Sequence, residues 1–533
     1  MKNTFGQSLT VTVFGESHGP AVGVVLDGLA PGLPVSEAEI ARQLSRRRPV
    51  SLLDTARREP DAFQLLSGVF DGHTTGTPLT VVIPNTDVRS RDYAYGTARP
   101  SHADYAAAQK YHGFEDYRGG GHFSGRVTAA LVAAGGILLP ALRRLGIQVG
   151  THILRCGSAR DRAFDDVEAD LRLLETADFP VLDAAAGDAI NAQIMDAKQH
   201  NDSVGGVTQT AVTGLPAGLG EPWFDSVEGL LSHALYSIGG VKGVEFGAGF
   251  GFAEGFGSEL NDPFRMQNGR VVTETNHSGG VNGGVTNGMP VLFQCAVRPT
   301  PSIGLPQQTV DFLRMENAEL TVEGRHDPAI LRRICPVIDS VTAIVLCDLI
   351  AQRFGTDALR NGDFRGTQSA SLRPEQNLVL IGMPTCGKTT VGRLLSALTG
   401  RRLLDTDELL TRRIGSLPDY IRHNGEEAFR AEEAAVIAAV SRERSAVIAT
   451  GGGAVLRAEN VRALKQSGLL VFLDRSPELL RPAADRPLSA TADSLAALYK
   501  TRYPIYRHTA DRTVSADAAP EDVAAAILRE VLR

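Results

Sequence analysis

An eight-residue segment at 382–389 (GMPTCGKT) restricts the possible fold around it more than any other stretch of the chain. It fits the phosphate-binding loop pattern, in which two glycines are followed by lysine and a hydroxyl residue. An apolar run at 377–381 (NLVLI) precedes the loop, and residues 390–398 follow with apolar side chains on one helical face. This order predicts a strand, a loop and a helix, with the loop amides and the helix N-terminus facing a phosphate.

Polar residues in this loop and at the next strand end predict a nucleotide site. Lys388 is expected to reach the γ-phosphate of ATP, and the Thr389 hydroxyl to hold Mg²⁺. Residues 403–408 (LLDTDE) end an apolar run with Asp405 and Asp407, and parallel α/β sheets place their ligands at strand ends. An ordinary glycine-rich turn is the alternative, and the strand-like and helix-like flanks disfavour it.

Composition excludes several function classes. A chain of 533 residues with 43% apolar residues predicts two or more domains, and its net charge of −7 argues against a general nucleic-acid binder. Five cysteines without a CxxC pair predict neither a disulfide framework nor a structural zinc site, as in a reducing, cytoplasmic protein. The N-terminus lacks a signal-peptide core, and glycines and proline interrupt the longest apolar stretch, 129–142, so we expect no membrane segment.

Changes in composition and hydrophobic pattern along the chain predict two domains with a linker between them. Residues 1–356 are glycine-rich, and we expect strands and helices there at 9–14, 21–26, 80–83, 36–44 (capped by Ser36) and 341–354. Residues 357–376 are polar without an apolar period, which predicts a linker. In residues 377–533, apolar strands at 378–381, 446–449 and 469–473 alternate with amphipathic helices, which predicts a parallel α/β sheet.

Further motifs follow the loop in order: EEAFRAEE (426–433), TGGG (450–453), DRPLS (485–489) and TRYPIY (501–506). With the loop and DTD, they give the segment from 377 to 533 a resemblance to shikimate kinase, a P-loop fold of the nucleoside-monophosphate-kinase type. The resemblance implies that Asp407 binds and orients the shikimate hydroxyls, and that Arg430, Arg502 and the amide of Gly452 bind the carboxylate. It implies Mg²⁺ at Thr389 and Asp405, and ATP contacts from Thr385, Cys386, Gly387, Lys388, Thr389, Thr390 and the lid residue Arg486. Thr385 stands where the family usually has glycine, and the lid is short.

Two histidines of the first domain lie in unusual settings. His18 follows a strand-like run in GESHG (15–19), and His102 lies in RPSHAD (99–104). A lone histidine is more often structural than catalytic. Nearby, however, RRRP (46–49) and RREPD (57–61) form a basic cluster within an acidic protein, which suits a small polyanion. The glycine-rich segment 276–288 alone would indicate only a hairpin loop.

Together with DYRGGG (116–121), VKGVEFG (241–247), RPTPS (298–302) and GRHDP (324–328), these segments resemble chorismate synthase across most of residues 1–356. The resemblance implies a β-α-β sandwich-type fold, a homotetramer, and a 1,4-anti elimination of phosphate from 5-enolpyruvylshikimate 3-phosphate with reduced FMN, for which NADPH is a candidate reductant. His18 and His102 would be the acids, with Asp339 as a further catalytic residue, and Arg47 and Arg48 would bind substrate. The implied flavin contacts are Ser124, Gly125, Gly239, Gly240, Gly283, Arg298, Pro299, Thr300, Pro301, Ser302, Arg325 and Arg47.

Several positions depart from this family's pattern. His122 and Phe123 replace an arginine and a serine, Leu53 replaces an arginine, and Arg298 and Asp339 stand for lysine and glutamate. The leading hypothesis is a bifunctional enzyme of aromatic biosynthesis. Two alternatives stay open: a flavin reductase joined to another small-molecule kinase, and an active chorismate synthase with a degenerate, regulatory P-loop domain.

Overall fold

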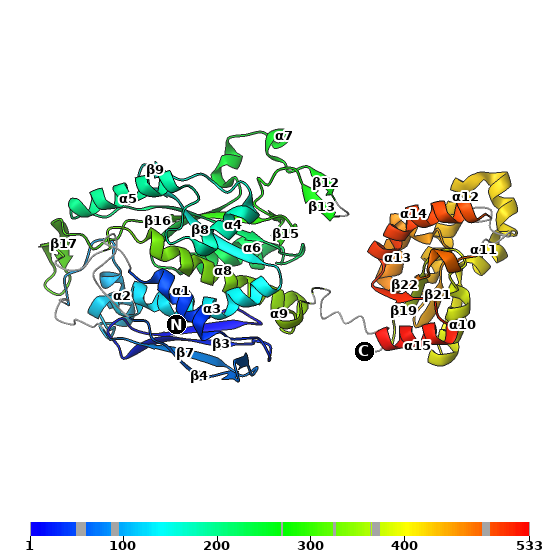
Figure 1. Ribbon diagram of the computed structural model, residues 1–533, viewed down its shortest axis with the longest axis horizontal. Helices are drawn as coiled ribbons and strands as arrows, with labels where there is room; N and C mark the ends of the chain where they lie inside the picture. Colours follow the sequence, from blue (N-terminus) through cyan, green and yellow to red (C-terminus); the bar gives the residue numbers. More distant parts are fainter. Residues whose placement is uncertain are drawn as a thin grey trace. The chain divides into compact units, whose positions relative to one another are not determined.

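The computed structural model describes residues 2–49, 60–86, 95–267, 270–322, 327–362, 364, 372, 374–481 and 491–531. The chain divides into two compact units, Met1–Gly366 and Thr367–Arg533 (Figure 1). Each unit has its own cluster of buried apolar side chains. We describe the two units separately.

Unit 1 is built around two five-stranded antiparallel sheets. The first has the order β1-β2-β3-β7-β4, formed by Thr4–Phe5, Thr10–Gly15, Ala21–Asp27, Leu79–Pro84 and Gln64–Ser67. The second has the order β11-β16-β10-β8-β9, formed by Val241–Phe246, Val291–Val297, Gly206–Thr213, Gln148–Cys156 and Ala159–Arg160. The expected strands at 9–14, 21–26 and 80–83 are therefore confirmed as β2, β3 and β7.

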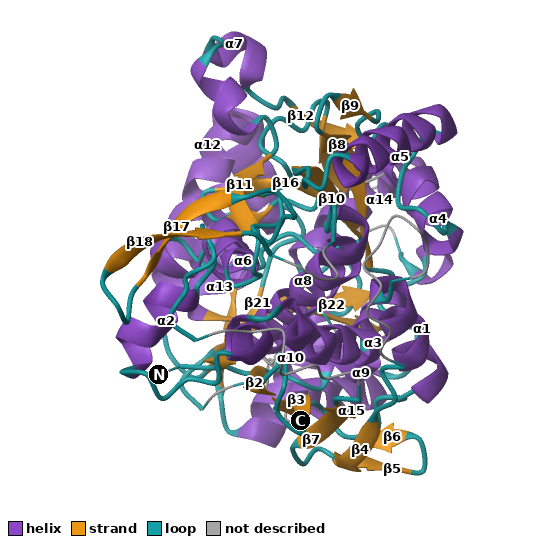
Figure 2. Cartoon of the chain, turned by 90° about the vertical axis from the view of Figure 1, so that its left-hand side faces the viewer, coloured by secondary structure: helices purple, strands orange, loops and turns teal. Residues whose placement is uncertain are grey.

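Three helices fill the space between the sheets: α1 (Glu37–Arg47), α3 (Thr128–Arg144) and α8 (Leu331–Phe354). Helix α3 packs on β3 and β7, α8 packs on β8 and β10, and the three helices pack on one another. Figure 2 shows β3, β7 and β4 on one side of α1 and α3, with β8 and β10 on the other. The result is the β-α-β sandwich that the sequence predicted. Ser36 caps α1 as expected, because its side chain accepts a hydrogen bond from Glu39 N.

Helix α3 runs through the apolar stretch 129–142, which Gly135, Gly136 and Pro140 interrupt. The glycines serve packing: a Cβ at Gly135 would lie 2.1 Å from Ser340 Oγ on α8, and one at Gly136 would lie 2.6 Å from Ile40 Cα on α1. Tertiary packing thus outweighs the low helix propensity of these residues.

Helix α8 begins ten residues before the predicted start at 341 and contains Pro336. Its side chains are almost all buried. Among the described residues, α8 and the segment Gly125–Arg144 are long and apolar enough to cross a membrane, but both are largely buried inside the unit. This burial is typical of the core helices of a globular domain.

Shorter elements surround this core. The outer helices are α2 (Asp104–Tyr111), α4 (Val167–Thr176), α5 (Ala184–Gln199), α6 (Val227–Tyr236) and α7 (Gly257–Leu260). The hairpins are β5–β6 (Val69–Phe70, His73–Thr74), β12–β13 (Phe264–Gln267, Arg270–Thr273), β14–β15 (Val281–Asn282, Val285–Thr286) and β17–β18 (Gln307–Asp311, Glu316–Leu320). The glycine-rich segment 276–288 therefore contains a hairpin, as its composition alone suggested.

The predicted linker at 357–376 begins too early. Residues Ala358–Asn361 form helix α9, which packs on α8 and α3 and buries Ala358 and Leu359. These two apolar side chains belong to the core of unit 1. The sequence did not predict this because the rest of the segment is polar. The division between the units falls after Gly366.

Unit 2 is a parallel α/β domain. Its sheet has the order β20-β21-β19-β22-β23, formed by Arg402–Asp405, Ala446–Ala449, Asn377–Ile381, Gly468–Asp474 and Arg512–Ser515. The helices are α10 (Lys388–Thr399), α11 (Thr406–Ile414), α12 (Leu417–Val440), α13 (Ala458–Ser467), α14 (Ala492–Thr509) and α15 (Pro520–Val531). The strand, loop and helix predicted around 382–389 are confirmed as β19, its loop and α10.

Candidate active sites

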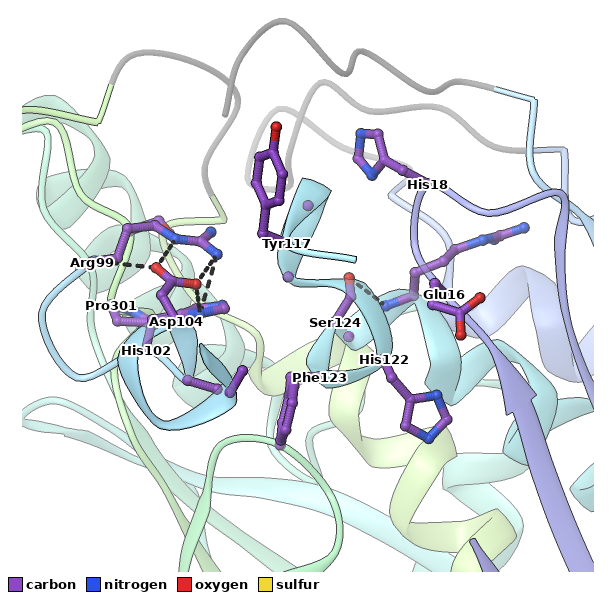
Figure 3. Close-up of a pocket in the computed structure, with 18 of the residues that line it drawn as sticks. Glu16, His18, Arg99, His102, Asp104, Tyr117, His122, Phe123, Ser124 and Pro301 are labelled. Atoms are coloured by element: carbon purple, nitrogen blue, oxygen red, sulfur yellow. Dashed lines mark hydrogen bonds and ion pairs between the residues drawn. The ribbon is translucent and has the colours of Figure 1, made fainter. Parts of the chain in front are cut away.

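A cavity of about 1200 Å³ opens in unit 1 and collects residues from distant parts of the chain. Its lining includes His18 after β2, His102 before α2, and Arg47 and Arg48 at the end of α1. Figure 3 shows His18 and His102 on opposite sides of the short helical segment that carries Tyr117 and Ser124. The volume exceeds the 300–1,000 Å³ that is common for one small ligand, so the cavity has room for two.

His102 is held by an ionised carboxylate. Its Nδ1 lies 2.8 Å from Asp104 Oδ1, and Arg99 donates to both Asp104 oxygens through Nε (2.8 Å) and Nη2 (2.7 Å). Burial opposes the ionisation of Asp104, but the hydrogen bonds from Arg99 and His102 outweigh it and hold its pKa well below the usual range. Arg99 Nη2 also lies 3.1 Å from His102 Nδ1, so both neighbours engage this nitrogen and Nε2 is the one left for a ligand.

The loop that carries His18 is tied to a turn of three glycines, Gly119–Gly121. Ser17 N donates to Gly121 O over 3.0 Å, and His18 itself is only 8% exposed. His122, next to the turn, lies in the same cavity and contacts Gly15 O through Nδ1 at 2.7 Å. Since a carbonyl only accepts, that nitrogen is the donor, and the ring orientation of His122 is fixed.

Buried charges form one wall of the cavity. Arg126 Nη1 donates to Asp61 Oδ1, and Arg47 Nη1 lies 3.8 Å from Asp61 Oδ2. Arg333 pairs with Asp327 at 2.5 Å. Burial and the charge of Arg333 lower the pKa of Arg47 to about 9. With Arg48, these side chains put four guanidiniums against two carboxylates on this wall, a local surplus that suits a polyanionic ligand, whereas the whole lining holds five guanidiniums and six carboxylates.

The structure brings most of the predicted flavin contacts to this cavity and leaves some outside its lining. Those that line it are Arg47, Ser124, Gly125, Gly239, Thr300, Pro301 and Ser302. Four of the predicted contacts are not part of the lining: Gly240, Gly283, Arg298 and Pro299. Arg298 lies near the lining, because its Nη1 donates to the carbonyl oxygen of Ser101, the residue before His102. Gly283 lies in the β14–β15 turn. Arg325 and the departure Leu53 fall outside the described residues.

Asp339 is not brought to the two histidines. It lies on α8 and lines a second, much smaller cavity with Arg46 and Gln43. Its Oδ2 accepts from Arg46 Nη1 at 3.0 Å, and burial raises its pKa. The order of motifs does not show which way a side chain on a helix points. The resemblance alone therefore could not show that Asp339 lies away from the two histidines.

The sequence analysis missed residues that hold the predicted site residues in place. Asp104, Asp61 and Arg333 were not singled out, although Asp104 and Asp61 stand inside quoted motifs. A carboxylate two residues after a candidate histidine was the available signal for Asp104. The partnership of Asp61 with Arg126 spans 65 residues and had no local signal.

In unit 2, the phosphate loop holds its own lysine. Lys388 Nζ donates to Gly382 O (3.0 Å) and Met383 O (2.7 Å) and lies 3.7 Å from Cys386 Sγ. Gly387, with φ of 97°, forms the N-cap of α10, so the loop presents the N-terminus of this helix to a ligand. The exposed Thr390 follows in the first turn.

A candidate Mg²⁺ site lies beside this loop. Thr389 Oγ1 donates to Asp405 Oδ2 at 2.6 Å, while Asp405 Oδ1 caps α11 by accepting from Asp407 N and Glu408 N. A hydroxyl and a carboxylate at the end of a parallel strand are the oxygen ligands that Mg²⁺ prefers. The two residues fit the predicted ion.

A second group of predicted site residues comes together at the Gly451–Gly453 turn. A Cβ at Gly451 would lie 2.7 Å from Asp407 Oδ1 and 3.1 Å from Glu433 Oε1, and one at Gly453 would lie 2.0 Å from Arg430 Nη1. Arg430 pairs with Glu433 at 2.7 Å. Arg502 Nη1 and the Tyr506 hydroxyl both donate to Gly452 O. The glycines thus let Asp407 and Arg430 approach the backbone closely. Arg486 falls outside the described residues.

Thr385 adopts a conformation that explains the glycine usual at its position. Its φ is 64°, in the left-handed region that β-branched residues rarely occupy. Its hydroxyl donates to Arg481 O at 2.9 Å, and this bond offsets part of the strain.

Comparison with known proteins places both units. The family model for chorismate synthase matches residues 9–351, and that for shikimate kinase matches residues 384–532. Chorismate synthase of Thermococcus kodakarensis is 45% identical over 350 residues, covering 65% of this chain and 97% of that protein. The enzyme of Methanosarcina barkeri is 44% identical over 351 residues, covering 65% of this chain and 95% of that protein.

Solved structures also resemble parts of the chain. A crystal structure of chorismate synthase aligns with a TM-score of 0.52 and 27% identity, covering 65% of this chain and 93% of that one. Shikimate kinase from Acinetobacter baumannii in complex with shikimate is 36% identical, covers 30% of this chain and 93% of that one, and has a TM-score of 0.29. The chain belongs to the chorismate synthase family and carries a shikimate kinase domain behind it, as a bifunctional enzyme of the shikimate pathway.

Proposed function

We propose that the cavity of unit 1 is where 5-enolpyruvylshikimate 3-phosphate loses phosphate to give chorismate. The observation that carries this proposal is that His18 and His102 line one cavity, which also contains Arg47 and Arg48. A 1,4-elimination with an anionic leaving group needs proton donors and cationic side chains around one substrate, and this cavity supplies both. The degenerate-domain alternative has no observation that favours it.

His102 acts as an acid through Nε2, because Asp104 and Arg99 engage its Nδ1. His18 acts from the other side of the glycine turn. Arg47, Arg48, Arg126 and Arg333 bind the phosphate and carboxylates of the substrate, and Asp61 keeps two of these guanidiniums in place. His122, with its ring fixed by Gly15 O, is a third imidazole in the same space.

Reduced FMN fits the same cavity. Ser124, Gly125, Gly239 and residues 300–302 would hold it, since they offer hydroxyls and backbone amides beside the aromatic side chains of Tyr117 and Phe123. When bound, reduced flavin supplies the electron density that a substrate with a weakly acidic proton needs in order to lose phosphate. NADPH is the proposed reductant.

In unit 2 we propose phosphorylation of the 3-hydroxyl of shikimate by ATP. Residues 385–390 bind the phosphates, with Lys388 neutralising charge, while Thr389 and Asp405 hold Mg²⁺. Asp407 orients the attacking hydroxyl, and Arg430, Arg502 and the Gly452 amide bind the carboxylate. The observation that supports this is the convergence of Asp407, Arg430 and Glu433 on the Gly451–Gly453 turn.

Both reactions are tested on the whole chain. Lys388→Ala should abolish ATP-dependent phosphorylation of shikimate and leave FMN-dependent phosphate release unchanged, and loss of both activities would contradict two independent sites. His18→Ala and His102→Ala should each lower chorismate formation at least about 100-fold, the scale of a lost general acid. Unchanged turnover in either variant would remove that histidine from the mechanism.

We also propose a cytoplasmic homotetramer assembled through unit 1. Unit 1 exposes large aromatic side chains that a partner subunit would cover, including Trp223 (87% exposed), Phe224 (95%), Phe250 (85%) and Phe256 (76%). The five cysteines are free and buried, which suits a reducing compartment. Analytical ultracentrifugation tests the assembly: a monomer at micromolar concentration would contradict it. Because Trp223 is the only tryptophan of the chain, its emission should shift to shorter wavelength on assembly.

A further inference from the structure

We infer that the glycine turn 119–121 is a spacer that positions the two cavity histidines, with one glycine packed against each imidazole. This inference rests on the proposed roles of His18 and His102, but the packing it describes can be measured separately. Glycine is needed at Gly119 and Gly120 because a larger side chain would displace a histidine ring.

The contacts are direct and separate. A Cβ at Gly119 would lie 2.3 Å from His18 Cε1 and 2.4 Å from His18 Nδ1. A Cβ at Gly120 would lie 3.0 Å from His102 Cε1 and 3.3 Å from His102 Nε2. Adjacent residues of one turn therefore face different histidines, which lie 84 residues apart in the sequence. The approach at Gly119 is impossible for a Cβ, and the approach at Gly120 is merely tight.

The turn itself is firmly held. All three glycines have positive φ (60°, 80° and 52°), and a Cβ at Gly121 would lie 2.0 Å from Asp116 O. Asp116 also accepts from Arg118 N and Nε. On the other side, Ser17 N donates to Gly121 O at 3.0 Å, so the His18 loop and the turn share a backbone hydrogen bond. A rigid turn can transmit its geometry to the rings that lie on it.

The spacing has a chemical consequence. Consecutive Cα atoms are 3.8 Å apart, so contacts to neighbouring glycines keep the two Cε1 atoms within about 12 Å of each other. Two acids within this distance of each other can serve two different atoms of ligands bound in one cavity. Since misplacement by about 1 Å can cost about 100-fold in rate, shifting one ring should impair one acid and leave the other in place.

A crossed set of double variants tests the spacer. Gly119→Ala should lower chorismate formation at least about tenfold in the wild-type background and less than about threefold in the His18→Ala background, where no ring is left to displace. In the His102→Ala background its effect should remain full. Gly120→Ala should show the reverse pattern with a smaller effect. A glycine needed only for its φ would act equally in all three backgrounds, and that result would overturn the inference.

Gly146→Ala is the matched control for backbone strain. Gly146 also has a positive φ (78°), but nothing lies within 4 Å of its Cβ position, and it does not line the cavity. Gly119→Ala should lower the melting temperature of unit 1 more than Gly146→Ala does, and the excess should disappear in the His18→Ala background. If the excess persists there, or if Gly119→Ala leaves turnover unchanged, the spacer is refuted. If His18→Ala alone leaves turnover unchanged, the proposed function fails instead. The comparison of melting temperatures then still shows whether Gly119 packs against His18.

Discussion

Replacing Asp339 by asparagine separates the role implied by family resemblance from the role implied by geometry. The resemblance implies a catalytic residue, whereas in the structure Asp339 is 1% exposed on α8, outside the cavity that holds His18 and His102. Its carboxylate accepts from Arg46 at the N-terminal side of α8, and its pKa is raised because burial disfavours the charged form. The geometry therefore predicts that the ionised Asp339 carboxylate is a buried charge that lowers the stability of unit 1.

The sign of the stability effect follows from that raised pKa. Between the unfolded value, 3.8, and the raised folded value, the folded state binds the proton more tightly, so stability falls as pH rises through this window and stays lower above it. Asparagine resembles the protonated acid in shape. Asp339→Asn should therefore match the wild type at the acidic end of the window and exceed its stability at neutral pH.

The expected magnitude is modest. Each unit by which the folded pKa is raised corresponds to about 1.4 kcal/mol. The raised pKa already includes the attraction to Arg46, which opposes the effect of burial. Arg46 keeps a hydrogen bond to Gln43 Oε1 at 2.8 Å, and the new amide oxygen can accept from it. We therefore expect Asp339→Asn to be more stable than the wild type at pH 7, with turnover within about threefold of the wild type.

Differential scanning calorimetry between pH 4 and pH 8 measures the stability. Added ATP identifies the unfolding transition of unit 2, because a ligand raises the melting temperature only of the domain that binds it. Asp104→Asn is the matched comparison, because it makes the same change beside His102. A fall in chorismate formation of more than about tenfold in Asp339→Asn, or a loss of stability at pH 7, would refute the reasoning and restore Asp339 to the catalytic set.

Three further predictions follow from single contacts. Asp104→Asn should lower chorismate formation at least about 100-fold, because His102 loses the carboxylate that contacts its Nδ1; unchanged turnover would contradict this. Burial of Glu39 is outweighed by hydrogen bonds from Arg42 and Arg143, which lower its pKa to about 2. Glu39→Gln should therefore remove an acid-induced loss of stability between about pH 4.5 and 2; melting curves of the variant and the wild type at pH 3 test this. Thr385→Val should destabilise unit 2 by about 1 kcal/mol through the lost bond to Arg481 O, whereas Thr385→Gly should change it less, because relief of the left-handed strain compensates; equal losses would contradict the strain.

Sequence reasoning succeeded where the chemistry is local. The phosphate loop needs a strand before it and a helix after it, and β19 and α10 supply both. Ser36 caps α1 because a serine oxygen reaches the N–H three residues on. Motif order also identified His18, His102 and the arginine cluster. In each case a few neighbouring residues carry the full physical reason.

It failed where tertiary contacts decide. The packing roles of Gly135 and Gly136 could not be inferred from the sequence, because their partners, Ser340 and Ile40, are distant along the chain. Motif order does not show which side of α8 Asp339 faces, and the fold places this residue outside the lining of the larger cavity. Asp61 was overlooked, since its bond to Arg126 joins residues that only the fold brings together. The glycine turn was noted as a motif, but its contact with two histidines could not be read from spacing.

The chemistry of the two reactions explains why each unit can be complete by itself. Shikimate kinase makes a phosphate ester that must still gain an enolpyruvyl group before chorismate synthase can use it, so the product of one site is not the substrate of the other. Direct transfer between the sites would bring no benefit, and no shared site is required. Consistently, every residue that lines the unit 1 cavity lies between Asn3 and Val337, and the described phosphate-loop, Mg²⁺ and carboxylate-site contacts of unit 2 lie between Gly382 and Tyr506. Joining the two enzymes in one chain therefore guarantees their production in equal amounts, and this benefit does not depend on how the units are arranged.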